Sequence, residues 1–303
     1  MEKKFDLVIV MPIGPNCNLN YIDDTIDSIK YYFTSKYKLI ILDDSHKGAG
    51  AEINRKHPDV EVLKTKKNLG VNAGLYLNLC YAYQQALEQY DFELLLKIDD
   101  DALITGKGPD QDALQFFKEM PQVGMAGLYQ TGENFTNFLG NQVDNSWPRK
   151  QLMKDTCTWK LIRRPIANLT LRKLFFKAIR KGYEIGENIQ GGAYFMSRAC
   201  LNKLKEAQYL PVDNLKTVNL GEDHLLSLLT KLVGFKLGDL ASGNLPLGTT
   251  WKGLPASPEV LHAKGKKIIH STRSWQDMNE EQIRAYFNKY RKHEGARQDA
   301  IIR

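Results

Sequence analysis

Three consecutive aspartates carry the clearest chemical signal in the chain. Asp99, Asp100 and Asp101 directly follow an apolar run at residues 92–98. Adjacent carboxylates repel one another unless cations neutralise them, and Mg²⁺ and Mn²⁺ take oxygen ligands and often bridge carboxylates to substrate phosphates. The triplet therefore predicts a site for Mn²⁺ or Mg²⁺ together with a diphosphate. The alternative is a solvated acidic turn.

A second acidic group stands where a loop enters a leucine-rich segment. Its residues are Gly221, Glu222, Asp223 and His224. A carboxylate held beside an acceptor hydroxyl can act as a general base. Acidic residues in a first turn also stabilise any helix through its macrodipole, so both interpretations stay open here.

A third pair, Asp43 and Asp44, follows the apolar run at residues 38–42. A carboxylate at this point can accept a hydrogen bond from an N–H group of a nucleotide base. Aspartates are also common turn residues that need no ligand.

The elements that must position these residues follow from hydrophobic periodicity. Apolar runs predict strands at residues 5–10, 38–42, 60–63, 92–98, 123–128, 189–196, 235–240 and 267–270. Helical spacing predicts helices at residues 22–33, 75–86, 110–120, 223–233 and 279–290. Asn18 or Asn20 is the expected N-cap of the first of these helices. Residues 129–147 and 241–256 are expected to be loops. The alternation predicts βαβ units, and ligands bind beyond the carboxyl ends of such strands.

The composition excludes several classes of protein. With 303 residues, 43% of them hydrophobic and 25% charged, the chain can bury the core of one large or two small globular domains. Its apolar runs fall far short of the roughly 20 residues of a membrane span. The four cysteines are too scattered for a disulfide framework or a zinc site. We therefore expect a soluble, cytoplasmic protein with reduced thiols.

The net charge of +7 belongs to one segment. From Arg149 to Lys181 the sequence has one acidic residue, Asp155, and eleven lysines and arginines: 149, 150, 154, 160, 163, 164, 172, 173, 177, 180 and 181. Within Leu169–Lys181 one helical face is apolar, with Leu171, Leu174, Phe175 and Ala178. That pattern suits a peripheral contact with an anionic membrane, on the inner face, or a core-packed helix with a solvated basic rim. No nucleic-acid-binding motif accompanies it, so nucleic acid is not an expected partner.

Taken together, the motifs resemble the family 2-like glycosyltransferases of GT-A fold. Six segments occur in the family's order: VIVMPIGPN, LIILDDSH, KTKKNLGVNAG, LLLKIDDDALI, NIQGGAYFMSRACLNKL and NLGEDHLLSLLTKLVGFKLGDL. They cover most of residues 5–240. The resemblance implies an α/β fold with a mostly parallel central sheet flanked by helices. It also implies a nucleotide-sugar-binding half at 1–128, a variable insertion at 129–188, an acceptor and catalytic half at 189–270 and a helical extension at 271–303.

The resemblance also assigns roles to positions. It implies Asp223 as the catalytic base and Asp101 as a metal ligand, with His270, or as second choice His262, completing the metal shell. For the nucleotide sugar it implies Pro12 and Ile13 beside the nucleotide, Asp43 on the base, Asp99 near the ribose, and the further positions Asn68, Asp100, Gly191 and Gly192. Gln190 belongs to the same glycine block. Trp251, in a loop rich in glycine and proline, is expected to close over the donor and exclude water.

The implied reaction is transfer of a single sugar from a nucleotide-diphosphate sugar, expected to be a UDP-sugar, to a hydroxyl of a glycan, lipid-linked or protein acceptor, with inversion. Leu75 and Tyr76 stand where the family usually has an Arg-Asn pair, so the resemblance does not extend to the donor phosphate contacts of that region. The QxxRW block of processive synthases is missing, which favours transfer of a single sugar. The alternatives are a nucleotidyltransferase, for which no Gly-rich, Lys-containing phosphate loop is found, and a non-catalytic sugar-nucleotide or glycan-binding module.

Overall fold

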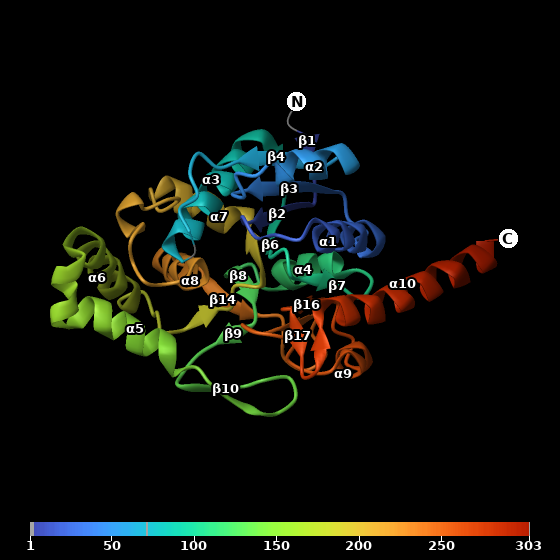
Figure 1. Ribbon diagram of the computed structural model, residues 1–303. Coiled ribbons are helices and arrows are strands. Elements are labelled where there is room, and N and C mark those ends of the chain that lie inside the picture. Colours follow the sequence, from blue (N-terminus) through green and yellow to red (C-terminus); the bar gives the residue numbers. More distant parts are fainter. Residues whose placement is uncertain (1–2, 71, 303) are drawn as a thin grey trace.

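The computed structural model describes residues 3–70 and 72–302, with the side chains of 4–70, 72–159 and 161–293. Val71 of one matching segment and the side chain of Lys160 in the basic segment lie outside this part. The described residues form a seven-stranded central sheet flanked by helices (Figure 1), in the order β14, β8, β13, β6, β2, β3 and β4. The bounds of these strands are Lys236–Asp239, Val123–Gly127, Ala193–Ser197, Leu94–Ile98, Leu7–Ile13, Tyr37–Asp43 and Glu61–Lys64.

The sheet is mostly parallel, which confirms the expected α/β fold class. Strand β13 pairs antiparallel with both β6 and β8, while the other neighbouring strands of the sheet pair in parallel. In this register Ala193, the first residue of β13, lies opposite Ile98, the last residue of β6. The residues before β13 therefore meet the aspartates after β6 at one edge of the sheet.

Strands of this sheet are apolar on both faces, as parallel sheets covered by helices are. In β2, Val8 and Val10 belong to the core on one face, whereas Leu7, Ile9 and Met11 belong to the core on the other. The first core is covered by α3 (Ala73–Gln89), α6 (Pro165–Ile179), α7 (Arg198–Glu206) and α8 (Glu222–Leu232). The second is covered by α1 (Leu19–Tyr32), α2 (Ala49–Lys56) and α4 (Pro109–Glu119).

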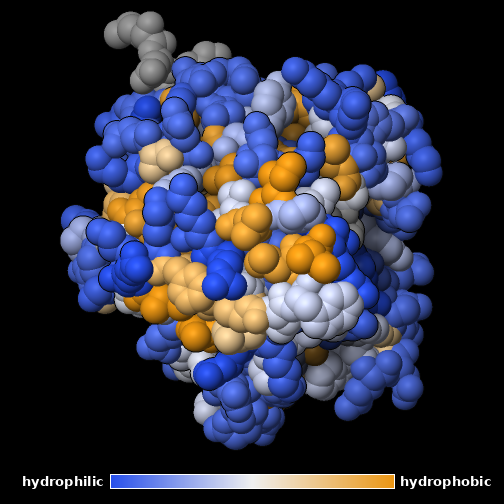
Figure 2. Space-filling model, turned by 90° about the vertical axis from the view of Figure 1, so that its left-hand side faces the viewer, coloured by the Kyte–Doolittle hydropathy of each residue, from blue (hydrophilic) through white to orange (hydrophobic). Residues whose placement is uncertain are grey.

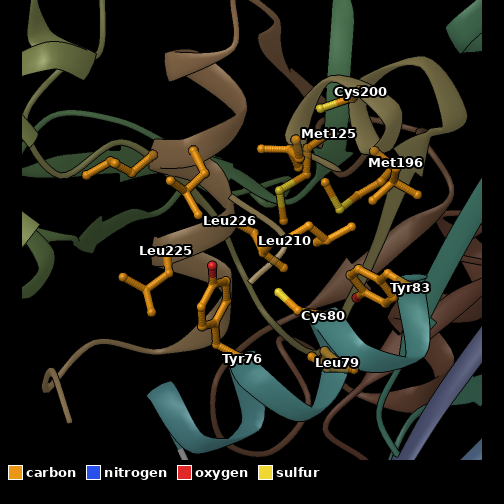
Figure 3. Packing of buried hydrophobic residues seen from close by; sticks show 14 of the residues in the cluster. Tyr76, Leu79, Cys80, Tyr83, Met125, Met196, Cys200, Leu210, Leu225 and Leu226 are labelled. Carbon is orange, nitrogen blue, oxygen red and sulfur yellow. The ribbon is translucent and has the colours of Figure 1, made fainter. Parts of the chain in front are cut away.

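Helices α3 and α8 pack closely in the first core. Figure 3 shows Tyr76 and Cys80 of α3 pointing toward the helix that carries Leu225 and Leu226. The phenol of Tyr76 accepts a hydrogen bond from Val212 N at 2.9 Å and donates one to the Tyr209 carbonyl oxygen at 2.9 Å. This packing fixes the position at which α8, and the acidic group at its start, meets the sheet.

A second, three-stranded sheet carries the C-terminal part of the chain. It contains β15 (Leu247–Thr249), β16 (Ile268–His270) and β7 (Leu103–Ile104). Strand β16 lies between the other two, parallel to β15 and antiparallel to β7. Because β7 follows the aspartates by only two residues, this sheet brings His270 back to the acidic turn.

The remaining elements lie around these sheets. They are β1 (Lys3–Lys4), β5 (Tyr90–Asp91), β9 (Tyr129–Gln130), β10 (Asn134–Thr136), β11 (Gln142–Asp144), β12 (Asn188–Ile189), β17 (Ser274–Trp275), β18 (Met278–Asn279), α5 (Ser146–Cys157), α9 (Pro258–Ala263), α10 (Glu280–Ile302) and the short 3₁₀ helices η1 (Trp159–Arg163) and η2 (Asp213–Leu215). In Figure 1, α5 and α6 lie at the left of the molecule and α10 extends at the right.

Several expected boundaries differ from the structure. The predicted strand at 189–196 is divided, because residues 190–192 form a turn between β12 and β13. The predicted loop at 129–147 contains the β10–β11 hairpin, and the one at 241–256 contains β15. Helices α2, α5, α7 and α9 were not predicted; α2 and α9 have only eight and six residues, too few for a clear period. The predicted cap Asn18 is confirmed, since its Oδ1 accepts from Asn20 N at 3.0 Å.

The apolar face predicted within residues 169–181 is part of the first core. Leu171, Leu174, Phe175 and Ala178 are all buried. That face of α6 therefore contacts the protein interior rather than a bilayer, which is the core-packed alternative. None of the described helices has both the length and the apolar character needed to traverse a lipid bilayer.

Candidate active site

The acidic triplet begins one residue beyond β6, at the carboxyl edge of the sheet. Asp99 N donates to the carbonyl oxygen of Gly192 at 2.9 Å, which extends the β6–β13 pairing by one bond. Ala102 N donates back to the Asp99 carbonyl oxygen at 3.1 Å, so the chain turns within the triplet. Thr25 of α1 attaches this turn to α1, because its hydroxyl donates to the Ala102 carbonyl oxygen at 2.8 Å.

Two of the three aspartates converge on a histidine. Asp99, Asp101 and His270 each offer one ligand atom, and these atoms lie within 4.8 Å of one another. The Nε2 atom of His270 is 3.2 Å from Asp101 Oδ1 and 3.5 Å from Asp99 Oδ2. Among the described residues this is the group that could hold a metal ion with three such ligands.

The imidazole of His270 is oriented by its other nitrogen. Nδ1 lies 2.8 Å from the Thr250 carbonyl oxygen, to which it donates, and Nε2 is thereby directed toward the aspartates. The ring is buried, which by itself would lower its pKa, but hydrogen bonding with Asp101 and the charges of Asp101 and Asp99 raise the pKa of His270.

Gly192 provides the space for this ring. A Cβ atom on Gly192 would lie 2.1 Å from His270 Nδ1 and 2.3 Å from its Cγ, closer than any side chain tolerates. The glycine predicted to line the sugar therefore has a packing reason of its own: it lets the histidine approach the end of β6.

Asp101 is the most strongly anchored member of the group. Ser271 Oγ donates to its Oδ2 at 2.7 Å, and Arg273 Nε lies 2.7 Å from the same oxygen. Burial would raise the pKa of this carboxyl, but the hydrogen bonds from His270 and Ser271 and the charge of Arg273 hold the pKa well below its usual range. Asp101 is therefore ionised at every physiological pH.

Asp100 differs from its two neighbours. It does not belong to the Asp99, Asp101 and His270 group. Its burial, followed by the charges of Asp101 and Asp99, raises the pKa of its carboxyl to about 7. Its backbone carbonyl oxygen accepts from Arg284 of α10 at 3.3 Å, which attaches the C-terminal helix to the acidic turn.

A buried lysine joins the two acidic groups. The Nζ atom of Lys97, on β6, lies 2.6 Å from Asp99 Oδ1 and 3.1 Å from Glu222 Oε1, and it donates to the Gly191 carbonyl oxygen at 3.1 Å. Lys97 is completely buried. Burial of Glu222 raises its pKa to about 7 in spite of the opposing charge of Lys97. Glu222 was named from the sequence as part of the second acidic group, whereas Lys97 was not singled out, although a lysine inside so apolar a strand is a usable signal.

Asp223 lies at the other side of the glycine turn. A Cβ atom placed on Gly191 would be 3.2 Å from Asp223 Oδ2, so this carboxylate faces the turn between β12 and β13. Its Oδ1 accepts from His224 N at 2.8 Å, and it is partly exposed. The ring of His224 contacts that of Trp147 at a centroid distance of 5.4 Å. The base candidate therefore lies between the metal group and the start of α5.

The expected nucleotide residues gather at the ends of β2 and β3. Ile13 lies opposite Asp43 in the strand register. Strand β2 pairs with β6 only as far as Val10, so Pro12, which has no N–H to donate, lies beyond that pairing. The carboxylate of Asp43 already accepts from Ser45 N at 2.9 Å and from Gly50 N at 3.1 Å.

The Asp43 side chain therefore holds the start of α2, which was not anticipated for a residue expected on the nucleotide base. Asn68 is tied to the same edge, because its side-chain amide donates to the Asp44 carbonyl oxygen at 3.1 Å.

Trp251 is highly exposed, at 75%. It follows Thr250, whose N donates to the His270 carbonyl oxygen at 2.8 Å, so its loop is attached beside the metal group. A cavity of about 170 Å³ next to this loop is lined by Thr249, Lys252 and the β10–β11 hairpin residues Phe135 and Val143, among others. Trp251 is thus exposed on a loop that is attached beside the metal group.

His262, the second choice for the metal shell, lies elsewhere. It is on α9 and packs against Tyr290 of α10, with ring centroids 4.3 Å apart. The group formed with Asp99 and Asp101 therefore contains His270 and not His262. A further cavity of about 1160 Å³ contains residues such as Asp6, Glu93 and Ser197, at the opposite edge of the sheet, and none of the candidate site residues lines it.

Comparison with protein-family models gives no match, and comparison with curated proteins gives none either. Among solved structures, the chain is similar to the mannosyltransferase PcManGT from Pyrobaculum calidifontis in complex with GDP-Man and Mn²⁺, at 14% identity and a TM-score of 0.45 over 79% of this chain and 56% of that one. It is also similar to TarS of S. aureus, at 16% identity and a TM-score of 0.42 over 86% of this chain and 38% of that one. This chain thus spans well under two thirds of either protein's length.

Proposed function

We propose that the chain is a metal-dependent glycosyltransferase of GT-A fold, which transfers one sugar from a nucleotide-diphosphate sugar to an acceptor hydroxyl. Asp99, Asp101 and His270 carry the proposal, because they converge at the carboxyl edge of a mostly parallel sheet. This is the edge at which such sheets bind nucleotides. A second pair of carboxylates, Glu222 and Asp223, begins α8 on the far side of the glycine turn.

The donor set of the site fits Mn²⁺ or Mg²⁺. Two carboxylates and one imidazole combine the hard oxygen ligands of both ions with a nitrogen that suits Mn²⁺ better. The hydrogen bond from His270 Nδ1 to Thr250 keeps Nε2 available as the ligand atom. The bound ion would neutralise charge on the departing diphosphate.

The donor would lie along the sheet edge. Pro12, Ile13 and Asn68 would border the nucleotide, with Asp43 acting on the base or, through its bonds to Ser45 and Gly50, holding the loop that does so. Asp100 would face the donor beside the metal. Gly191 and Gly192 leave room for the sugar. A UDP-sugar is the expected donor.

Asp223 is the proposed base, because Glu222 is committed to the buried ion pair with Lys97. The acceptor oxygen forms its bond to the anomeric carbon while the bond from that carbon to the diphosphate breaks. Asp223 takes the proton of the acceptor hydroxyl. Attack from the face opposite the leaving group gives inversion. The Trp251 loop would exclude water while this happens.

Thermal melting in the presence of Mn²⁺ and a panel of UDP-, GDP- and dTDP-sugars tests the proposal, because a ligand that binds only the folded state raises the melting temperature. One donor should stabilise the protein only with the metal, and Asp101→Asn should lose this effect. Incubation with that donor should release the nucleoside diphosphate. Release of pyrophosphate would instead indicate a nucleotidyltransferase, and binding without turnover a non-catalytic module.

A further inference from the structure

One face of the molecule, formed by α5, η1 and α6, exposes large apolar side chains. Trp159, Ile162 and Ile166 are 65%, 72% and 69% exposed, and Leu169 and Phe176 are exposed as well. Figure 2 views the side of the molecule on which α5 and α6 lie in Figure 1, and it shows apolar residues gathered there among hydrophilic ones. We call these five residues and the cations among them the α5–α6 face.

These apolar residues are not the ones that the sequence pattern placed on a membrane. The predicted set, such as Leu171 and Phe175, is buried against the core. Helix α6 is thus apolar on two sides, and its second side has no partner among the described residues. An exposed apolar area of this kind marks an interaction surface more often than chance.

The charged residues near these apolar side chains are almost all basic. Ten described lysines and arginines of this segment are all exposed: Arg149, Lys150, Lys154, Arg163, Arg164, Arg172, Lys173, Lys177, Arg180 and Lys181. The segment's single acid, Asp155, is buried and accepts from Gln151 at 2.6 Å. Two guanidinium groups lie over the exposed aromatic rings, Arg163 over Trp159 at 4.9 Å and Arg172 over Phe176 at 5.3 Å.

The charge pattern selects the occupant. A second copy docked on the same face would place these cations against their own counterparts, which repel. Nucleic acid would neutralise the cations but would leave Ile162 and Ile166 in water. The cores of protein interfaces are depleted in lysine. An anionic bilayer satisfies both features, since the headgroups attract the cations while the apolar side chains and the tryptophan enter the interfacial layer.

We propose that the α5–α6 face rests on the surface of an anionic lipid bilayer. The face is connected to the candidate active site: Trp147, exposed at the start of α5, contacts the ring of His224, which adjoins Asp223. Docking would therefore bring the proposed base close to the membrane surface. Resting on the proposed function, the inference extends to the acceptor, which would be a lipid-anchored hydroxyl compound.

Vesicle co-sedimentation of the full chain tests the docking. The probes are vesicles of phosphatidylcholine alone and of phosphatidylcholine mixed with phosphatidylserine. We expect binding only to the second kind, weakened by salt. Two triple variants should each lower the partition coefficient more than tenfold: Trp159→Ser/Ile162→Ser/Ile166→Ser, and Arg163→Glu/Arg164→Glu/Lys173→Glu. The matched control, Lys118→Glu/Lys203→Glu/Lys205→Glu on α4 and α7, reverses the same number of exposed charges and should bind as the parent does.

Unaltered binding by both triple variants, or no binding of the parent to phosphatidylserine vesicles, overturns the proposal. So does sedimentation analysis that shows a dimer dissolved by the apolar triple variant, because the face would then belong to a second copy. Donor hydrolysis in vesicle-free buffer with Mn²⁺ should be equal in all four proteins. Its absence from all of them would refute the proposed function and leave the docking result standing.

The proposal that the acceptor is lipid-anchored is tested by a separate measurement. With a radiolabelled donor and a membrane fraction, the parent should move label into the organic-solvent extract, and the apolar triple variant should move at least tenfold less. Label that appears only in the aqueous phase overturns the proposal of a lipid-anchored acceptor.

Discussion

The ammonium group of Lys97, which is completely buried, lies 2.6 Å from the carboxylate of Asp99, a member of the candidate metal group. Removing one partner of a buried ion pair leaves the other charge uncompensated. Lys97→Met should therefore lower the free energy of unfolding by about 3 kcal/mol, measured by denaturant titration without added metal.

The double variant Lys97→Met/Glu222→Gln separates this effect from simple loss of packing. Since the second change removes the buried carboxyl group that would lose its cation, it should recover part of the stability. A double variant that is less stable than the single one would show that Glu222 is not stabilised by the lysine.

Gly192 is predicted to be intolerant of any side chain, because its Cβ position overlaps the ring of His270. Gly192→Ala should displace that ring and weaken Mn²⁺ binding roughly 10- to 100-fold, the usual cost of disturbing the support of a metal ligand. Isothermal titration with Mn²⁺ measures this. Gly14→Ala is the control, since a Cβ atom there meets no atom within 4 Å; equal loss in both variants would contradict the explanation.

The sequence revealed polar residues that adjoin an apolar run, but it did not reveal which groups those residues contact in the fold. The aspartates after β6 and the acidic start of α8 were identifiable because an apolar run adjoins each of them. Lys97 was missed because its meaning depends on Glu222, which lies 125 residues away. Asp43 was assigned to a ligand, but its side chain bonds to Ser45, in the loop before α2, and to Gly50, in α2 itself, a helix too short to be predicted.

The basic segment shows the same limit from another side. Its charge was plain from composition, and the helical period correctly gathered Leu171, Leu174 and Phe175 on one face. A period cannot tell which of two apolar faces meets the core, because that depends on α5, a helix that the sequence pattern did not reveal. The exposed set at Trp159, Ile162 and Ile166 was therefore visible only in the structure.

Arg273 should compete with a metal ion, because its side chain is 70% exposed and yet pairs with Asp101 at 2.7 Å. Arg273→Met removes this competitor, and an ion pair in which one partner is largely exposed is weak. Mn²⁺ affinity should rise by about threefold, whereas donor affinity should fall if, in the parent protein, the metal displaces the Arg273 guanidinium from Asp101 and this group then contacts the diphosphate. Titrations with Mn²⁺ alone and with donor at saturating Mn²⁺ distinguish the two effects; a fall in Mn²⁺ affinity would contradict the competition.

Stability should depend on pH through Glu222. Burial raises its pKa from an ordinary 4.5 to about 7. Between these values the folded state keeps the proton and the unfolded state releases it, so the free energy of unfolding should fall as pH rises, by at most about 1.4 kcal/mol per pH unit. Glu222→Gln, which cannot ionise, should flatten this fall. Melting temperatures of both proteins from pH 4.5 to pH 7 provide the measurement, and parallel curves would count against it.

The two carboxylates at the start of α8 should differ in their effect on turnover. Asp223 faces the glycine turn and is partly exposed, while Glu222 is buried against Lys97. Asp223→Asn should therefore reduce kcat by about 10²- to 10⁴-fold, the range of a general base, while donor binding measured by thermal shift stays unchanged. Glu222→Gln keeps the shape of its site and should lose far less. If the asparagine variant retains full turnover and the glutamine variant does not, the base is Glu222. Lys97 would then lower the pKa of the base through the 3.1 Å contact.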